Sequence, residues 1–304
     1  MFIINPDPYS LPCYRIGPFR TKDVAINHCL PDDNTIDKYF NERFDGRKFT
    51  YTENGRQAIN FALQCLNLQK DDVVTILTTS GNFYISGCVT REIEKFCNWS
   101  REIMQETKVL FVNHEFGFPY DHPERLKEYG LPIIEDCANA FFSKGVGADP
   151  GTVGDYVIYS FPKTFPLQVG GLLVANDLKS VKQHYQIDDK LLRYIKNVLS
   201  YYIDSRQKII EKRVSNYNYL SQELHDMGFS ERFELKQGIM PGVFMFKAKG
   251  SGIDLPELKK HFYAHGVQCS VFYGEEAFFI PVHQALEKED LDYFVAIIKD
   301  FLFK

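Results

Sequence analysis

The sequence lacks the features that mark several common classes of protein. None of its seven cysteines forms a CxxC pair, which argues against a zinc ribbon or a disulfide framework and indicates a reducing cytoplasm. No apolar run is long enough to span a bilayer, and the opening MFIINPDPYS does not look like a signal peptide. The net charge is -5 and no run of Lys and Arg is present, so nucleic acid is not an expected partner.

Several well-known enzyme motifs are also absent. The chain has no GxxxxGKS/T, no HExxH and no GxSxG, so P-loop, zinc-protease and α/β-hydrolase chemistry have no support, and no metal site is expected. The glycine-rich segment GVGADPG does not stand between a strand and a helix, as a dinucleotide fingerprint must. A nucleotide-binding dehydrogenase has only this segment in its favour.

The composition is that of an ordinary globular protein of 304 residues, 44% of them hydrophobic and 25% charged. From Lys48 to Val174, strand-like runs alternate with helix-like segments. This alternation predicts an α/β domain with a mostly parallel sheet and helices on both faces. Beyond Asp177 a long helical stripe precedes short strands and helices, which is typical of a smaller α+β C-terminal domain. We therefore expect an irregular N-terminal arm over residues 1–30, a large domain over 31–180, and a helical link with a small domain over 181–304.

The stretch from Leu131 to Val174 contains three short apolar runs, LPII, YVIYSF and LLVA, which are typical of buried strands. The first run ends in Glu135-Asp136, and the second leads into Lys163. Because ligands of open α/β sheets bind beyond the carboxyl ends of the strands, this acid and this lysine can face one ligand. The pair indicates a site for pyridoxal 5'-phosphate (PLP), which needs a lysine amine for its aldehyde and an acid for its ring nitrogen.

A second feature follows a strand-like run that ends before Asn54. Apolar residues from Ala58 to Leu66 recur at helical spacing, and Asn54-Gly55 is a plausible start with Asn54 as the N-cap. The free N–H groups and the positive dipole end of a helix N-terminus suit a phosphate. An ordinary capped helix would show the same pattern, so the residues alone leave both interpretations open.

Several segments, in the right order along the chain, resemble the DegT/DnrJ/EryC1/StrS family of PLP-dependent sugar aminotransferases of fold type I. IIEDCANA resembles the family's viEDaAqA, and VGDYVIYSFPK resembles its GdvgcFSF…K. Gly170 and Gly171 follow Lys163 as the family's glycine pair follows its lysine. The similarity extends patchily from about Ile36 to the C-terminus. SFPK is shorter than the common SFxxxK form, which marks a divergent branch.

The resemblance implies roles for residues around the central strands. Lys163 would bond the cofactor and later transfer a proton, and Asp136 would hold the ring nitrogen. Asn139 replaces the glutamine that contacts the phenolic oxygen of PLP, and Ser160 matches the serine that donates to the phosphate. Because family members that dehydrate sugars carry histidine at the lysine position, Lys163 favours transamination.

The resemblance also covers residues in the first half of the chain. Gly55 and Arg56 align with the family's SGTaAL turn, which cradles the phosphate, and Arg56 replaces a threonine there. Phe83 falls on the aromatic that stacks on the cofactor ring. Tyr84 is the alternative if the alignment shifts by one residue. His114 matches a histidine near the cofactor, although a lone histidine is more often structural.

The implied function is a PLP-dependent aminotransferase that moves an amino group from glutamate to a nucleotide-linked keto-sugar, in the biosynthesis of amino sugars and surface polysaccharides. The family also implies a homodimer with active sites at the subunit interface. Between Tyr273 and Phe278, however, family members carry a longer segment at the substrate mouth. This deletion leaves a second hypothesis open, a catalytically silent PLP-fold protein with a binding or regulatory role.

Overall fold

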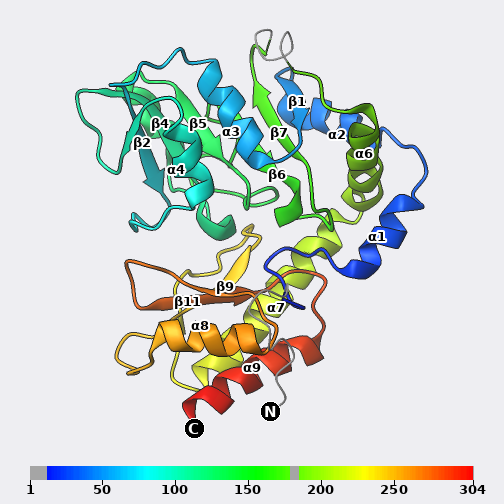
Figure 1. The fold of residues 1–304 in the computed structure, drawn as a ribbon, viewed down its shortest axis with the longest axis vertical. Helices are drawn as coiled ribbons and strands as arrows, with labels where there is room; N and C mark the ends of the chain where they lie inside the picture. The colour runs from blue at the N-terminus through cyan, green and yellow to red at the C-terminus, as the bar shows by residue number, and fades with distance from the viewer. Residues whose placement is uncertain (1–11, 179–184, 304) are drawn as a thin grey trace.

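The computed structural model describes residues 12–178 and 185–303. Their strands form two sheets, one of seven strands and one of four. Figure 1 shows the larger sheet with its helices in the upper part of the molecule and the smaller sheet with its helices below. The long helix α7 (Arg206–His225) connects the two parts. The bounds of the two domains inferred from the sequence stay a prediction.

The seven-stranded sheet has the order β1-β7-β6-β5-β4-β2-β3. The strands from β6 to β3 in this order run parallel, whereas β7 is antiparallel to both of its neighbours. The prediction of a mostly parallel sheet is therefore confirmed. The strands are β1 (Lys48–Thr52), β2 (Val73–Thr78), β3 (Asn98–Ser100), β4 (Thr107–Asn113), β5 (Ile133–Asp136), β6 (Tyr156–Ser160) and β7 (Gly171–Ala175).

Helices cover both faces of this sheet, as the sequence predicted. Along β6, Val157 and Tyr159 pack into one core, and Ile158 packs into another on the opposite face. This alternation is what a strand buried on both faces produces. The first core includes the helices α2 (Thr35–Phe44) and α6 (Asp189–Ile203), and the second includes α3 (Gly55–Gln64) and α4 (Gly87–Ile93). Three short 3-10 helices complete this part: η1 (Glu115–Gly117), η2 (Pro123–Tyr129) and η3 (Phe161–Lys163).

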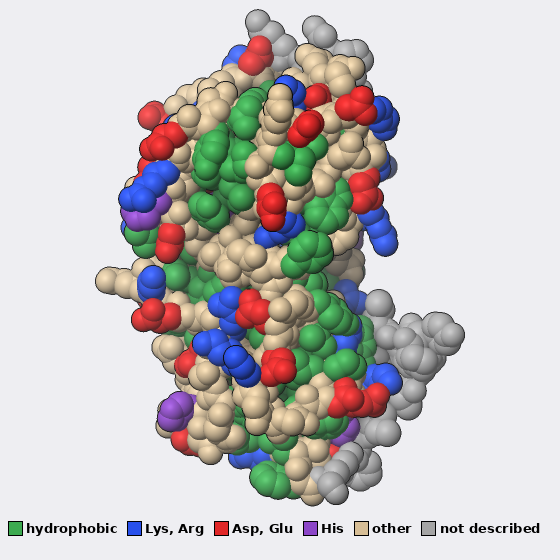
Figure 2. Space-filling model, turned by 90° about the vertical axis from the view of Figure 1, so that its left-hand side faces the viewer, with side chains coloured by type: hydrophobic (Ala, Val, Ile, Leu, Met, Phe, Trp, Pro, Cys, Tyr) green, Lys and Arg blue, Asp and Glu red, His purple; other side chains and the backbone are tan. Residues whose placement is uncertain are grey.

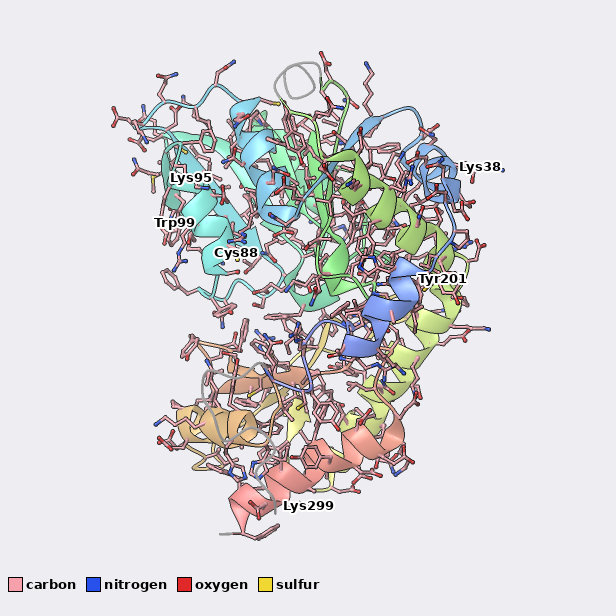
Figure 3. All side chains as sticks on the ribbon, turned by 45° about the vertical axis from the view of Figure 1, so that its right-hand side comes forward. Lys38, Cys88, Lys95, Trp99, Tyr201 and Lys299 are labelled. Carbon is pink, nitrogen blue, oxygen red and sulfur yellow. The ribbon has the colours of Figure 1, made fainter. Side chains whose placement is uncertain are left out.

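The outer edge of the sheet is a short, polar strand. Trp99 of β3, the single tryptophan of the chain, lies near Lys95, which follows α4 (Figure 3). Its indole N–H donates to the carboxylate of Glu94 at 3.0 Å. A short edge strand flanked by charged side chains offers little backbone for pairing with another sheet.

The second part of the chain builds an antiparallel sheet of order β10-β11-β9-β8. Its strands are β8 (Ser230–Glu231), β9 (Val243–Lys247), β10 (Ser270–Val271) and β11 (Ala277–Pro281). The helices α7, α8 (Leu255–Ala264) and α9 (Lys288–Leu302) share one apolar core with these strands. The alternation of strand and helix predicted for this region is therefore observed.

The N-terminal segment differs from the irregular arm predicted for residues 1–30. Residues 1–11 lie outside the described part of the chain, but Thr21–His28 forms the helix α1, so the prediction was wrong there. The carboxylate of Asp23, in the first turn, stabilises the start of this helix because it accepts the N–H of the N-cap residue Arg20 at 2.7 Å. Ahead of α1, Tyr14 forms a bridge with Val267, between α8 and β10. The segment therefore spans from the smaller sheet to α6, against which α1 packs.

The start of β7 brings the ends of β1 and β6 together. Gly171 pairs with Ser160 on one side and with Thr52 on the other. A Cβ atom at position 171 would lie 2.7 Å from the carbonyl carbon of Asn54 and 2.7 Å from Oγ1 of Thr52. Glycine is therefore needed for Asn54, which precedes α3, to lie against the start of β7.

Replacing this glycine should destabilise the fold. We expect Gly171→Ala to lower the free energy of unfolding by roughly 1 to 3 kcal/mol, because the new methyl group overlaps backbone atoms. Gly87→Ala is the matched control, since its Cβ would meet only the side-chain Nε of Arg91, at 3.8 Å. Urea unfolding of both variants measures the difference, and equal stabilities would contradict the packing argument.

Candidate active site

A cavity of about 290 Å³ lies at the carboxyl ends of the parallel strands. Lys163, at the end of η3 and directly after β6, lines it together with Asn139, which follows β5. Ser86, the N-cap of α4, lines it as well. The smaller sheet contributes Phe279 of β11 and Ser270 of β10. The cavity thus lies between the two sheets, at the edge that the sequence pattern predicted.

Asp136 ends β5 and is almost fully buried. Burial raises the pKa of its carboxyl group above the usual value, while the N–H of Ala138, at 3.0 Å from Oδ1, and the charge of Lys163 act to lower it. Within the described residues no cation lies within ion-pair distance of this carboxylate. A protonated ring nitrogen would supply the missing positive charge.

A buried arginine holds the backbone of Lys163. Arg213 of α7 is fully buried, and its Nη2 donates to the carbonyl oxygen of Lys163 at 2.8 Å. Its Nε donates to Gln284, whose amide donates to the carbonyl oxygen of Thr164 at 2.9 Å. Burial lowers the pKa of Arg213 to about 9, and no carboxylate among the described residues pairs with it. The guanidinium therefore serves to fix the turn that carries Lys163.

His283 lies beside this arginine and is neutral. Its Nδ1 accepts the N–H of Ala285 at 3.2 Å, so its Nε2 carries the proton and donates to the carbonyl oxygen of Arg15 at 3.0 Å. Burial lowers the pKa of His283 to about 3, and the charge of Arg213 acts in the same direction. The residue is therefore a structural support of the Arg213 site.

His114, predicted to lie near the cofactor, is buried behind the cavity rather than in its lining. Its Nδ1 accepts the N–H of Tyr120 at 3.0 Å, so its Nε2 donates to Glu135 at 3.2 Å. Three backbone N–H groups also donate to this carboxylate, those of Gly151, Val153 and Gly154. Burial raises the pKa of Glu135, but His114 and these donors lower it by more, so that it lies below its ordinary value.

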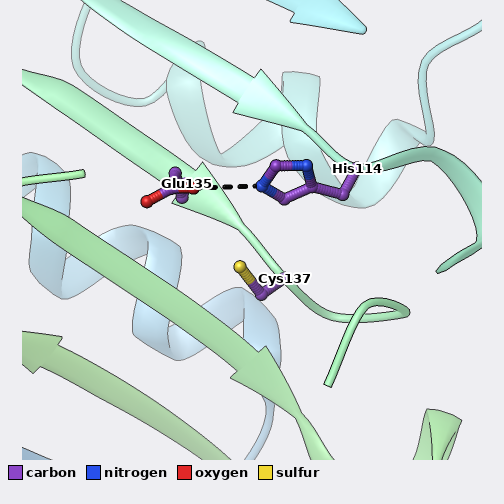
Figure 4. A group of neighbouring side chains, drawn as sticks. All are labelled: His114, Glu135 and Cys137. Atoms are coloured by element: carbon purple, nitrogen blue, oxygen red, sulfur yellow. Dashed lines mark hydrogen bonds and ion pairs between the residues drawn. The ribbon is translucent and has the colours of Figure 1, made fainter. Parts of the chain in front are cut away.

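The same residues resemble a metal site without having free ligand atoms. Ligand atoms of His114, Glu135 and Cys137 lie within 4.8 Å of one another (Figure 4). Both ring nitrogens and both carboxylate oxygens are already hydrogen-bonded, however. Burial raises the pKa of the Cys137 thiol well above its usual value, which keeps it protonated. The cluster is structural. The backbone N–H of His114 donates to the carbonyl oxygen of Asp136 at 3.2 Å, and His114 also acts to lower the pKa of the Asp136 carboxyl group.

The start of α3 lies against Ser160, as a phosphate site requires. Asn54 caps the helix by accepting the N–H of Gln57 at 3.1 Å, which confirms the predicted N-cap. The N–H groups of Gly55 and Arg56 are the first two of the helix and have no acceptor within it. A Cβ at Gly55 would lie 3.0 Å from Cβ of Ser160, so glycine keeps this cradle open. The side chain of Arg56 is exposed.

Of the two aromatic candidates for ring stacking, the structure brings Tyr84 to the cavity. Phe83 has 70% of its surface exposed, whereas Tyr84 lines the cavity and lies between Phe116 and Tyr273, with ring centroids 6.4 Å from each. The N–H of Tyr84 donates to the side-chain oxygen of Asn82 at 2.7 Å, and this hydrogen bond holds the turn that carries Phe83 and Tyr84. The role of Phe83 in stacking stays a prediction that this geometry does not support.

The short turn between Tyr273 and Phe278 helps to fix Tyr84. Glu275 in this turn forms an ion pair with Arg232 and accepts a hydrogen bond from the amide of Asn82 at 2.9 Å. The turn therefore reaches the loop that carries Tyr84. Where relatives were expected to have a longer segment, this chain has a compact link between its two parts.

The sequence reasoning missed the two charged residues that line the cavity besides Lys163, namely Glu115 and Lys259. Glu115 follows His114 and is buried, and its Oε2 accepts the N–H of Ser80 at 2.7 Å. Burial raises the pKa of its carboxyl group. Lys259 lies within the charged helix sequence PELKK, which looks like a solvated surface. Glu115 stands just after β4, beside the residue that the resemblance pointed to, whereas no local signal marked Lys259.

These residues fit PLP. The unpaired buried carboxylate of Asp136 suits the ring nitrogen, Tyr84 offers a ring face, and the cradle of Gly55 and Ser160 suits the phosphate. Asn139 lines the same cavity and offers an amide to the phenolic oxygen. The fold and the site together define a PLP-dependent transferase of the α/β type with a second, smaller sheet.

The comparison with protein families agrees with this class. A family model described as "Putative PLP-dependent aminotransferase" matches residues 36–237, which is more than half of the chain. The chain therefore belongs to this family of PLP-dependent aminotransferases, and the resemblance noted in the sequence is confirmed.

Curated relatives match only part of the chain. GDP-perosamine synthase of Escherichia coli O157:H7 is 28% identical over 197 residues, which cover 55% of this chain and 53% of that protein. The enzyme of the same name from Vibrio cholerae is 28% identical over 165 residues, 46% of this chain and 44% of that protein. The chain thus spans about half the length of the curated relatives it matches.

Solved structures share the fold at low sequence identity. The aminotransferase TlmJ from Streptoalloteichus hindustanus superposes with a TM-score of 0.70 at 16% identity, covering 93% of this chain and 94% of that one. At this identity the similarity establishes the fold alone. Of the helices in the described residues, none is both long and apolar enough to cross a membrane.

The buried His283 should make the protein sensitive to acid. The unfolded chain binds a proton below about pH 6.5, whereas the folded state takes it only near pH 3, so stability falls as the pH drops between these values. We expect His283 to lower the free energy of unfolding by about 1.4 kcal/mol for each unit by which the pH falls between about pH 6 and about pH 4. His283→Gln should lose less stability over this range in urea unfolding. Identical pH profiles for the two proteins would contradict the assignment.

Proposed function

We propose that the chain is an aminotransferase that moves an amino group from glutamate to a keto-sugar linked to a nucleotide, in the biosynthesis of amino sugars and surface polysaccharides. One observation carries this proposal: Asp136 ends β5, Lys163 follows the neighbouring parallel strand β6, and the charge of Lys163 acts on the carboxyl group of Asp136. The family membership and the similarity to GDP-perosamine synthase support it. The presence of lysine at position 163 favours transamination over the dehydratase chemistry of histidine-containing relatives.

The roles of the residues follow from their places. Bound PLP supplies an aldehyde carbon and an electron-withdrawing ring. The Nζ of Lys163 would bond the aldehyde carbon and, as a free amine, would move a proton from the substrate α-carbon to that cofactor carbon. Asp136 would hold the protonated ring nitrogen, and Asn139 would donate to the phenolic oxygen. Tyr84 would lie against the ring.

The phosphate is held at the opposite end of the cofactor. The first N–H groups of α3, from Gly55 and Arg56, together with the hydroxyl of Ser160 form the proposed anion site. Because Arg56 is exposed at this turn, its guanidinium has room to reach the phosphate oxygens.

We further propose that the protein acts as a cytoplasmic homodimer. The absence of CxxC pairs supports a reducing compartment. The exposed Phe83, beside the cavity, supports a partner subunit that covers this loop. On the face that Figure 2 shows, apolar side chains gather over the upper part of the molecule, while charges of both signs are interspersed. Sedimentation of the purified protein measures its oligomeric state directly.

The attachment site of the cofactor tests the proposed function. Borohydride reduction of the PLP-loaded protein, followed by peptide mass spectrometry, should place a pyridoxyl group on Lys163, and Lys163→Ala should carry none. Lys260→Ala is the control, because Lys260 is exposed and pairs with Glu257 at 2.6 Å. Glutamate should bleach the visible absorbance of the wild type. A labelled protein that no amino donor bleaches would instead support the silent binding protein.

Substitutions of the neighbouring residues Tyr84 and Phe83 should have different effects on PLP binding. We expect Tyr84→Ala to weaken PLP binding by roughly tenfold, because a ring face against the cofactor is lost. Phe83→Ala should change this affinity by less than about twofold and should weaken dimer formation. Absorbance titration of the apoprotein with PLP, together with sedimentation, measures both. The reverse order would restore Phe83 as the stacking residue.

A further inference from the structure

A second lysine lines the cavity from the side of the smaller sheet. Lys259 of α8 and Lys163 are far apart in the sequence, yet both side chains line the same cavity. The ammonium group of Lys259 forms a hydrogen bond with the hydroxyl of Ser270 at 3.2 Å. It also lies 5.9 Å from the ring centroid of Tyr273. Both partners are neutral, so its charge is not balanced by a carboxylate of the described residues.

Few charged side chains line the cavity, and Lys259 is the one available to a substrate. Lys163 and Lys259 are the cations in the cavity lining, and Glu115 is the acid. Glu115 points one oxygen at the N–H of Ser80 and is buried. Since Lys163 is committed to the cofactor in the proposed function, Lys259 is the cation that remains for a substrate.

The walls near Lys259 strengthen its attraction for an anion. Tyr84, Tyr263 and Phe279 line the same cavity and place aromatic rings around it. An ion pair in such surroundings is stronger than one at the surface, because the effective dielectric constant is lower. A lysine ammonium has three N–H donors, and Ser270 uses one position, so two remain for the oxygens of a carboxylate.

We propose that Lys259 binds a carboxylate of the amino donor and thereby places the donor amine at the cofactor. This inference rests on the proposed function, because the donor is taken to be a dicarboxylate. The site is small: the cavity that Lys163 and Lys259 share measures about 290 Å³, which suits a compact acid better than a nucleotide. Lys259 is therefore a determinant of donor specificity.

Binding of a non-reacting dicarboxylate tests this assignment without turnover. We would titrate glutarate into the PLP-loaded wild type, Lys259→Met and Lys259→Arg by calorimetry, after mass spectrometry has shown the pyridoxyl group on Lys163. Lys259→Met should bind glutarate at least roughly tenfold more weakly, and Lys259→Arg should recover most of the affinity. Lys260→Met is the matched control, since Lys260 is a neighbour on the same helix that pairs with Glu257 outside the cavity.

The outcomes distinguish this inference from the proposed function. Unchanged glutarate affinity in Lys259→Met, or no glutarate binding by the wild type, overturns the role of Lys259. A parallel titration with inorganic pyrophosphate tests the alternative that Lys259 binds the phosphate oxygens of the nucleotide-linked acceptor. If Lys259→Met weakens only pyrophosphate binding, Lys259 binds the acceptor and our assignment is wrong. If the wild type carries no pyridoxyl group on Lys163, the proposed function fails, and the inference that rests on it fails as well.

Discussion

The turn that carries Lys163 depends on one buried guanidinium. Arg213 lies on α7, in the second half of the chain, and holds the carbonyl oxygen of Lys163 without a carboxylate of the described residues to balance its charge. Burying an unpaired charge is unfavourable, so the surrounding structure must supply acceptors, which Gln284 and the carbonyl of Pro241 do. Because these acceptors come from the smaller-sheet part, the position of the lysine is set by how the two parts of the protein pack. The cavity between the sheets is therefore formed and fixed by the same contacts.

Two neighbouring acids in β5 show how the surroundings separate structure from chemistry. Glu135 points into a set of hydrogen-bond donors that lower its pKa, and it is satisfied within the protein. Asp136 points to the opposite side of the strand and has one backbone donor, so its pKa is raised by burial and it lacks a cation. Alternation along the strand alone places the two carboxylates on different faces. The acid that is not satisfied by the protein is the one available to a cofactor.

The short turn between Tyr273 and Phe278, which the sequence indicated as a deletion, forms contacts that connect the two parts of the protein. Instead of an open substrate mouth, Glu275 connects Arg232 with Asn82, and Asn82 positions Tyr84. Tyr84 and Lys259 thereby line the same cavity. A compact mouth is compatible with the small amino donor proposed above.

The sequence alone determined the order of strands and helices, the N-cap at Asn54, and the placement of Asp136 and Lys163 at the carboxyl ends of β5 and β6. Those features depend on local periodicity and on strands that pair in parallel, which a pattern reveals. Only the tertiary structure decided that Tyr84 rather than Phe83 lines the cavity, that His114 is fully hydrogen-bonded behind it, and that Lys259 faces Lys163 across it. The physical reason is that these outcomes depend on contacts between segments far apart in the chain, such as Asn82 with Glu275 and Arg213 with Lys163, which no local pattern encodes.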